Sequence, residues 1–128
     1  MGKRATVMVV DDDEYERSLF RILLEPCGYE ILEAQDGPAC LGACANRLPD
    51  LAIIDIGLPG MSGFELVAEL RKLYNRASLP LLMMSGEGDA AAYAKASALG
   101  ADDFLLKGTD ASVLFGRIAA LLARNHAK

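Results

Sequence analysis

Short apolar runs alternate five times along the chain with longer segments whose apolar residues recur every three or four positions. A short run bounded by turn-forming residues is typical of a buried strand, and the longer period is typical of an amphipathic helix. The predicted strands cover residues 6–10, 29–33, 51–55, 79–85 and 103–106. The predicted helices cover residues 14–25, 38–46, 63–73, 89–99 and 111–124. This order predicts an α/β fold, a parallel sheet with right-handed crossovers and helices on both faces.

Capping residues mark the ends of several predicted helices. Asp13, Ser62 and Asp110 stand at N-cap positions, and Gly100 is a good C-terminal stop. The apolar residues at helical spacing are Tyr15, Leu19, Ile22 and Leu23 in the first helix, Phe64, Leu66, Val67 and Leu70 in the third, and Leu114, Ile118, Leu121 and Leu122 in the last. With 128 residues, we expect a single domain over residues 1–128, with its core in residues 6–124 and no output domain.

Charged and polar residues gather where the predicted strands end. Asp11 and Asp12 follow the first strand, Asp55 ends the third, Ser85 ends the fourth and Lys107 follows the fifth. The second strand, which ends at Glu33, offers little. Open α/β sheets bind ligands at this carboxyl edge. If the strands are ordered 2-1-3-4-5, the four other strand ends are adjacent and their side chains converge.

The converging groups have complementary chemistry. Three crowded carboxylates repel one another and raise their pKa values, and a divalent cation such as Mg²⁺ relieves this repulsion. Asp55 is the candidate nucleophile for an aspartyl phosphate. The charge of a phosphoryl group there would be neutralised by Mg²⁺ and Lys107, with the Ser85 hydroxyl as a further donor. The residues therefore predict a cation site, an acyl-phosphate site, or both.

Four segments carry a family resemblance: Val-Val-Asp-Asp at 9–12, the stretch from Asp55 to Leu66, Met-Ser-Gly at 84–86 and Asp-Phe-Leu-Leu-Lys at 103–107. Through them the whole chain resembles the receiver domain of two-component response regulators. The resemblance implies a single-domain, doubly wound, flavodoxin-like (βα)5 fold with strand order 2-1-3-4-5. It also implies a bacterial cytoplasmic signalling domain rather than an enzyme, with self-catalysed phosphorylation and autodephosphorylation.

The resemblance assigns roles to individual residues. Asp55 takes the phosphoryl group from the phosphohistidine of a histidine kinase or phosphotransfer protein. Asp11, Asp12, Asp55 and the Gly57 carbonyl hold Mg²⁺. Ser85 and Phe104 form a switch pair, in which the hydroxyl turns toward the phosphate and the ring follows inward. The switch then acts on an output domain or a target protein.

The chain departs from the family pattern beside the lysine and beside the phosphoacceptor. Gly108 stands where the family usually has a proline after a cis peptide bond, so we expect a trans Lys107–Gly108 bond, a looser loop and a less firmly placed Lys107. Gly57 and Glu87 flank the site and should set the phosphate lifetime. Because Gly57 leaves its side open to water, we expect fast hydrolysis.

The helix at 89–99 is rich in alanine and has a smooth, weakly charged face. Together with residues 103–106 and 111–124, this face is the candidate surface for a phosphorylation-dependent homodimer or for a contact with the output. Tyr93, Lys95 and Arg117 are expected within its reach. The alternative interpretation is an ordinary packed helix.

Composition excludes several other classes. A net charge of −5 and a pI near 4.8 argue against a nucleic-acid-binding face. Three cysteines without a CxxC motif argue against disulfides and favour a reducing cytosol, with Cys40 and Cys44 as small core residues on one helix face. The sequence has no apolar run long enough to span a membrane and no signal peptide pattern.

Three other functions remain as alternatives. An aspartyl-phosphate hydrolase would need a second Asp at position 57, which is Gly57, and a cap domain. A flavin binder would have its phosphate repelled by Asp11, Asp12 and Asp13. A degenerate receiver that binds partners without phosphorylation is favoured only by Gly108.

Overall fold

The computed structural model describes residues 4–126, which form five strands and five α-helices in alternation. The elements are β1 (Thr6–Val10), α1 (Glu14–Leu24), η1 (Glu25–Cys27), β2 (Glu30–Ala34), α2 (Gly37–Asn46), β3 (Leu51–Asp55), α3 (Gly63–Leu73), β4 (Leu81–Ser85), α4 (Ala90–Leu99), β5 (Asp103–Leu106) and α5 (Ala111–His126). Compared with the prediction, β2 is displaced by one residue and α5 continues to His126. Strand β4 begins two residues later because the Leu79 amide closes a turn onto the Asn75 carbonyl.

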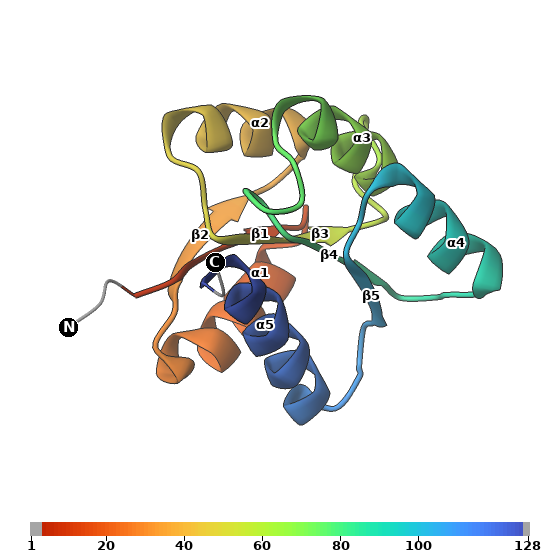
Figure 1. Cartoon of the computed structure of the whole chain (residues 1–128). Helices are drawn as coiled ribbons and strands as arrows, with labels where there is room; N and C mark the ends of the chain where they lie inside the picture. The colour runs from red at the N-terminus through yellow and green to blue at the C-terminus, as the bar shows by residue number, and fades with distance from the viewer. Residues whose placement is uncertain (1–3, 127–128) are drawn as a thin grey trace.

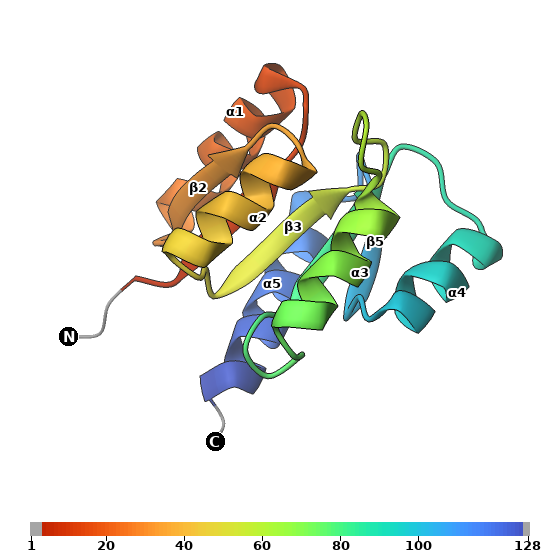
Figure 2. The ribbon, with the colours of Figure 1, turned by 90° about the horizontal axis from the view of Figure 1, so that it is seen from above.

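The five strands form one parallel sheet in the order β2-β1-β3-β4-β5, as predicted. Helices α2, α3 and α4 cover one face, and α1 and α5 cover the other (Figures 1 and 2). This arrangement confirms the flavodoxin-like fold. It places the carboxyl ends of all five strands at one edge of the sheet.

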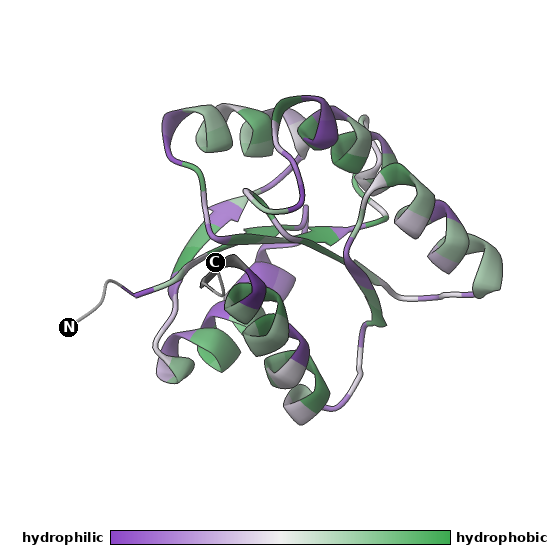
Figure 3. Ribbon diagram, viewed as in Figure 1, coloured by the Kyte–Doolittle hydropathy of each residue, from purple (hydrophilic) through white to green (hydrophobic). Residues whose placement is uncertain are grey.

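Two hydrophobic clusters fill the space between the sheet and its helices. Met8, Val10 and Ile54 contribute to the cluster beneath α2 and α3, whereas Val7 and Val9 contribute to the cluster beneath α1 and α5. Successive strand residues point to opposite faces, so the strands covered on both sides are apolar except at their ends, where Thr6, Asp55 and Ser85 stand. The central strands accordingly carry the hydrophobic colour in Figure 3.

Helix α1 packs through a different face from the predicted one. Phe20 and Leu24 are buried beneath it, whereas Tyr15 is 73% exposed, Ile22 is 68% exposed and Leu19 is 39% exposed. The predicted stripe is therefore wrong for three of its four members, and only Leu23 packs against the core. Both sets of residues recur at helical spacing, so periodicity alone does not tell which set faces the sheet.

The other local predictions agree with the structure. Asp13 and Ser62 cap α1 and α3 through their side chains, and Gly100 ends α4 with a φ of 114°. The predicted stripe of α5 is buried, and so are Cys40 and Cys44. All three cysteines are free thiols. Between residues 4 and 126, no helix is both long and apolar enough to cross a bilayer.

Candidate phosphoryl and metal site

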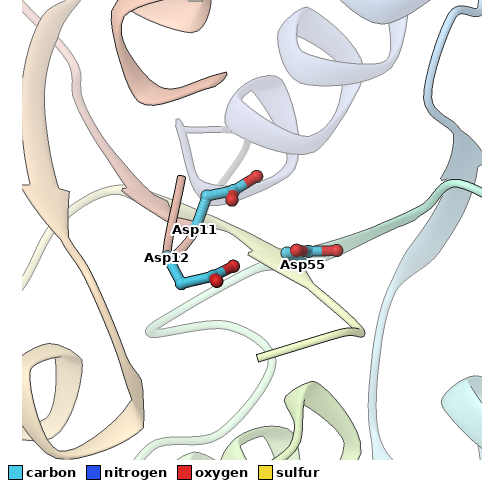
Figure 4. A group of neighbouring side chains, drawn as sticks. All are labelled: Asp11, Asp12 and Asp55. Carbon is cyan, nitrogen blue, oxygen red and sulfur yellow. The ribbon is translucent and has the colours of Figure 1, made fainter. Parts of the chain in front are cut away.

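Three carboxylates meet at the carboxyl edge of the sheet. Asp11 and Asp12 follow β1, and Asp55 is the last residue of the neighbouring strand β3. One oxygen of each carboxylate lies within 4.8 Å of the other two. In Figure 4 the carboxylates of Asp11 and Asp12 extend toward the side on which Asp55 lies. Asp11 and Asp55 are buried and Asp12 is exposed, so the group reaches the solvent through Asp12.

Lys107 follows the carboxyl end of β5 and reaches the same site. Its Nζ lies 3.2 Å from Asp11 Oδ2 and 3.3 Å from Asp55 Oδ2. Partial burial works against the charged lysine, but the hydrogen bond to Asp11 and the charge of Asp55 outweigh it and raise the pKa of Lys107. Burial also raises the pKa of Asp11, against the hydrogen bond that its carboxylate accepts from the Asp13 amide. The Lys107 ammonium therefore lies between two of the three carboxylates, those of Asp11 and Asp55.

A closed turn fixes the backbone of Lys107. The Thr109 amide and hydroxyl both donate to the Leu106 carbonyl, at 3.2 and 2.6 Å, and Gly108 has a φ of 86°. These are the features of a type II turn, which favours glycine at its third position. The trans Lys107–Gly108 bond is confirmed, because residues 4–126 contain no cis peptide. The looser loop stays a prediction, and the turn carries two hydrogen bonds to the Leu106 carbonyl.

The two candidate switch residues lie on adjacent strands. Ser85 ends β4, where its hydroxyl donates to the Glu87 carbonyl and accepts from the Glu87 amide at 3.2 Å. Phe104 lies on β5, half-buried, with the Tyr93 ring packed edge-on at 6.0 Å between centroids. A Cβ at Gly88 would lie 3.0 Å from the Phe104 ring, so the loop after Ser85 passes close to that ring. The loop thus contacts both residues.

Gly57 lies directly beside the Asp55 carboxylate. The Gly57 amide donates to Asp55 Oδ1 at 3.3 Å. A Cβ at position 57 would lie 3.9 and 4.0 Å from the two Asp55 oxygens. A side chain there would thus cover the carboxylate, whereas glycine leaves it open. Glu87 is exposed on the loop after β4.

The sequence prediction missed Arg17 and Glu33. Arg17 on α1 donates from Nη1 to the Asp11 carbonyl at 2.7 Å and from Nε to Glu33 at 2.9 Å. Glu33, at the end of β2, also accepts two hydrogen bonds from Arg21, which lower the pKa of its carboxyl despite partial burial. The sequence did contain a signal for this contact: Arg17 and Arg21 are four residues apart in the helix after β1 and therefore share one helix face.

The predicted partner surface combines α4, β5 and α5. Tyr93, Leu106 and Val113 are exposed apolar residues of these elements. Arg117 of α5 makes two contacts with Asp103 of β5, at 2.6 and 2.8 Å. Lys95 instead lies 4.5 Å above the Phe64 ring of α3 and so turns toward that helix.

A family profile and the curated relatives both identify the chain as a response regulator receiver domain. The profile of the response regulator receiver domain matches residues 7–119. The chain is 33% identical over 119 residues to the phosphate regulon transcriptional regulatory protein PhoB of Pseudomonas aeruginosa, and 36% identical over 118 residues to PhoB of Rhizobium meliloti. These matches cover 93% and 92% of this chain but only 52% of each relative, so the chain spans about half the length of the curated relatives it matches.

A solved structure agrees over nearly the full length of both chains. It is a CheY-like response regulator receiver domain protein from Methanospirillum hungatei, with a TM-score of 0.89 and 27% sequence identity. The alignment covers 97% of this chain and 98% of that one. The observed fold and the family profile therefore point to the same group of proteins.

Proposed function

Because the chain belongs to the response regulator receiver domains of two-component systems, we propose that Asp55 accepts a phosphoryl group from a phosphohistidine. An Asp55 oxygen forms a bond to phosphorus as the nitrogen–phosphorus bond breaks. The leaving imidazole nitrogen keeps the bonding electron pair and takes up a proton from solvent. Water later attacks the phosphorus, which releases inorganic phosphate and restores the Asp55 carboxylate. In both steps, this chain's own residues position the reacting groups.

One observation carries the proposal: Lys107 Nζ lies between Asp11 and Asp55 while Asp12 completes a carboxylate cluster. The family resemblance assigns the acceptor role to Asp55, which ends β3, and Asp12 is exposed. Asp55 has Lys107 at one oxygen and the Gly57 amide at the other, which are donors that a phosphoryl group could share.

The acidic cluster fits Mg²⁺, since a hard cation with oxygen ligands suits carboxylates within this spacing. Asp11, Asp12 and Asp55 would hold the ion, with the Gly57 carbonyl as a further ligand. When bound, Mg²⁺ supplies positive charge next to the phosphoryl oxygens. Lys107 binds a second phosphoryl oxygen, and the Ser85 hydroxyl leaves Glu87 to donate to a third.

We further propose that this turn of Ser85 draws Phe104 inward and alters the α4–β5–α5 face. The contacts of the β4–α4 loop with both residues support such coupling. A histidine kinase or phosphotransfer protein is the donor, and an output domain, a target protein or a second copy is the receiving partner. The cytoplasmic location stays a prediction.

The test is binding of beryllofluoride, which mimics the phosphoryl group. Amide shifts are followed by NMR with and without Mg²⁺, for the wild type and for Asp55→Asn. We expect Mg²⁺-dependent shifts at Asp55, Ser85 and Phe104 that the substitution abolishes. Shifts confined to the surroundings of Asp55 would reject the Ser85–Phe104 switch. A wild type without any response would favour the degenerate receiver instead.

A further inference from the structure

We propose that Arg17 is a positioning residue for the metal site, and that it acts by holding the main chain between Asp11 and Asp12. The proposal rests on the function proposed above. Arg17 belongs to α1, outside the carboxylate cluster, and its guanidinium reaches back to the turn that joins β1 to its own helix. Its effect on a cation would therefore be transmitted through the backbone.

Asp11 is held at every polar group. Its amide donates to the Ala34 carbonyl of β2 at 3.1 Å, and its carbonyl accepts from Arg17 at 2.7 Å. Its carboxylate accepts from the Asp13 amide at 3.0 Å and from Lys107 at 3.2 Å. Asp11 is only 2% exposed, so a lost partner would not be replaced freely by water. Among residues 4–126, Arg17 provides the hydrogen bond to the peptide group between Asp11 and Asp12.

Arg17 can do this because its guanidinium is itself oriented. Nε binds Glu33 at 2.9 Å while Nη1 points to the Asp11 carbonyl, and the side chain is 14% exposed. The planar fork of arginine allows two donors to point in two fixed directions, which a lysine ammonium on a flexible stem does not reproduce. The guanidinium thus links Glu33 near the end of β2 to the Asp11 carbonyl in the turn after β1.

Asp12 depends most on this support. It is exposed, so the direction of its carboxylate follows from the backbone that carries it. Residues that orient metal ligands typically change metal affinity by about 10–100-fold when they are replaced. Loss of the Arg17 bond should let the peptide plane rotate and weaken the three-carboxylate arrangement.

Electrostatic repulsion alone predicts the opposite change in Mg²⁺ affinity when Arg17 is replaced. Arg17 is a cation near a cation site, so removing its charge should strengthen Mg²⁺ binding through reduced repulsion. Positioning predicts weaker binding despite that gain. The sign of the change therefore separates an orienting role from a purely electrostatic one.

Arg21 provides a matched control. It also binds Glu33 from the same helix, at 2.7 Å, but its other contacts go to Glu25 and the Ile31 carbonyl rather than to Asp11. Arg21→Gln removes the same charge and a Glu33 ion pair without touching the turn after β1. Arg17→Lys keeps the charge and removes the fork.

The experiment is calorimetric titration of Mg²⁺ into the unphosphorylated chain, with folding of each variant checked by circular dichroism. Arg17→Gln and Arg17→Lys should each weaken binding about tenfold. Arg21→Gln should stay within about twofold of the wild type, since exposed ion pairs contribute little. The amide resonances of residues 11–13 should also shift in the metal-free Arg17 variants but not in Arg21→Gln.

Unchanged or tighter binding by either Arg17 variant, with a wild type that binds Mg²⁺, would overturn the positioning role and leave the proposed function intact. Equal weakening by Arg21→Gln would overturn it as well, because the effect would then belong to Glu33. A wild type that binds no Mg²⁺ would reject the proposed metal site and the role of Arg17 together.

Discussion

Replacing Gly63 by alanine should destabilise the protein, because the added Cβ would collide with the backbone at the end of the phosphoacceptor strand β3. Gly63 begins α3, and its amide donates to the Ile56 carbonyl at 3.0 Å. A Cβ there would press on the Asp55 carbonyl oxygen and lie 2.7 Å from Ile56 Cα. Both neighbours are backbone, so no side chain can rotate away. The Ile56 Cα would have to move by roughly 0.7 Å to regain an ordinary contact of 3.4 Å, and the Asp55 carbonyl oxygen, which lies closer, by more.

Forcing extra volume into a packed site typically costs 1–3 kcal/mol, and backbone neighbours put Gly63→Ala near the top at about 3 kcal/mol. Urea unfolding measures this loss directly. Gly42→Ala is the matched control, because its Cβ would meet nothing within 4 Å and it lies inside α2. That variant should gain up to about 1 kcal/mol from helix propensity. A Gly63→Ala protein within about 0.5 kcal/mol of the wild type, the usual scatter for surface substitutions, would refute the packing argument.

Three further predictions concern the site and its support. Gly57→Met should slow loss of phosphate from Asp55 by covering the open side of the carboxylate, and an unchanged half-life would count against shielding. Gly108→Ala should cost about 1–2 kcal/mol from backbone strain alone, since its Cβ meets nothing within 4 Å; an equal urea midpoint would reject the type II turn. Glu33 has a lowered pKa, so its contribution to stability is complete above its ordinary value of 4.5 and is lost as the pH falls through the folded value. Glu33→Gln should therefore flatten the acid limb of a stability–pH curve, and an unaltered limb would contradict this assignment.

Local signals were sufficient for the order of the elements and for the side chains at the strand ends. The caps at Asp13 and Ser62 act on amides two or three residues away, and the apolar runs of β1 and β3 follow from burial on both sheet faces. Once the strands are parallel, Asp11 and Asp55 must reach the same edge. That is why the carboxylate cluster could be predicted without coordinates.

Contacts between distant segments decided the rest. Lys107 and Asp11 are 96 positions apart in the sequence, and the parallel sheet brings them to a contact of 3.2 Å. Helix α1 buries Phe20 and leaves Tyr15 exposed, although both lie in stripes of the same helical period. The same orientation of α1 brings Arg17 onto the Asp11 carbonyl. Sequence patterns thus determined which residues reach the site, and tertiary packing determined what holds them there, since a local pattern contains no information about neighbours that only folding brings into contact.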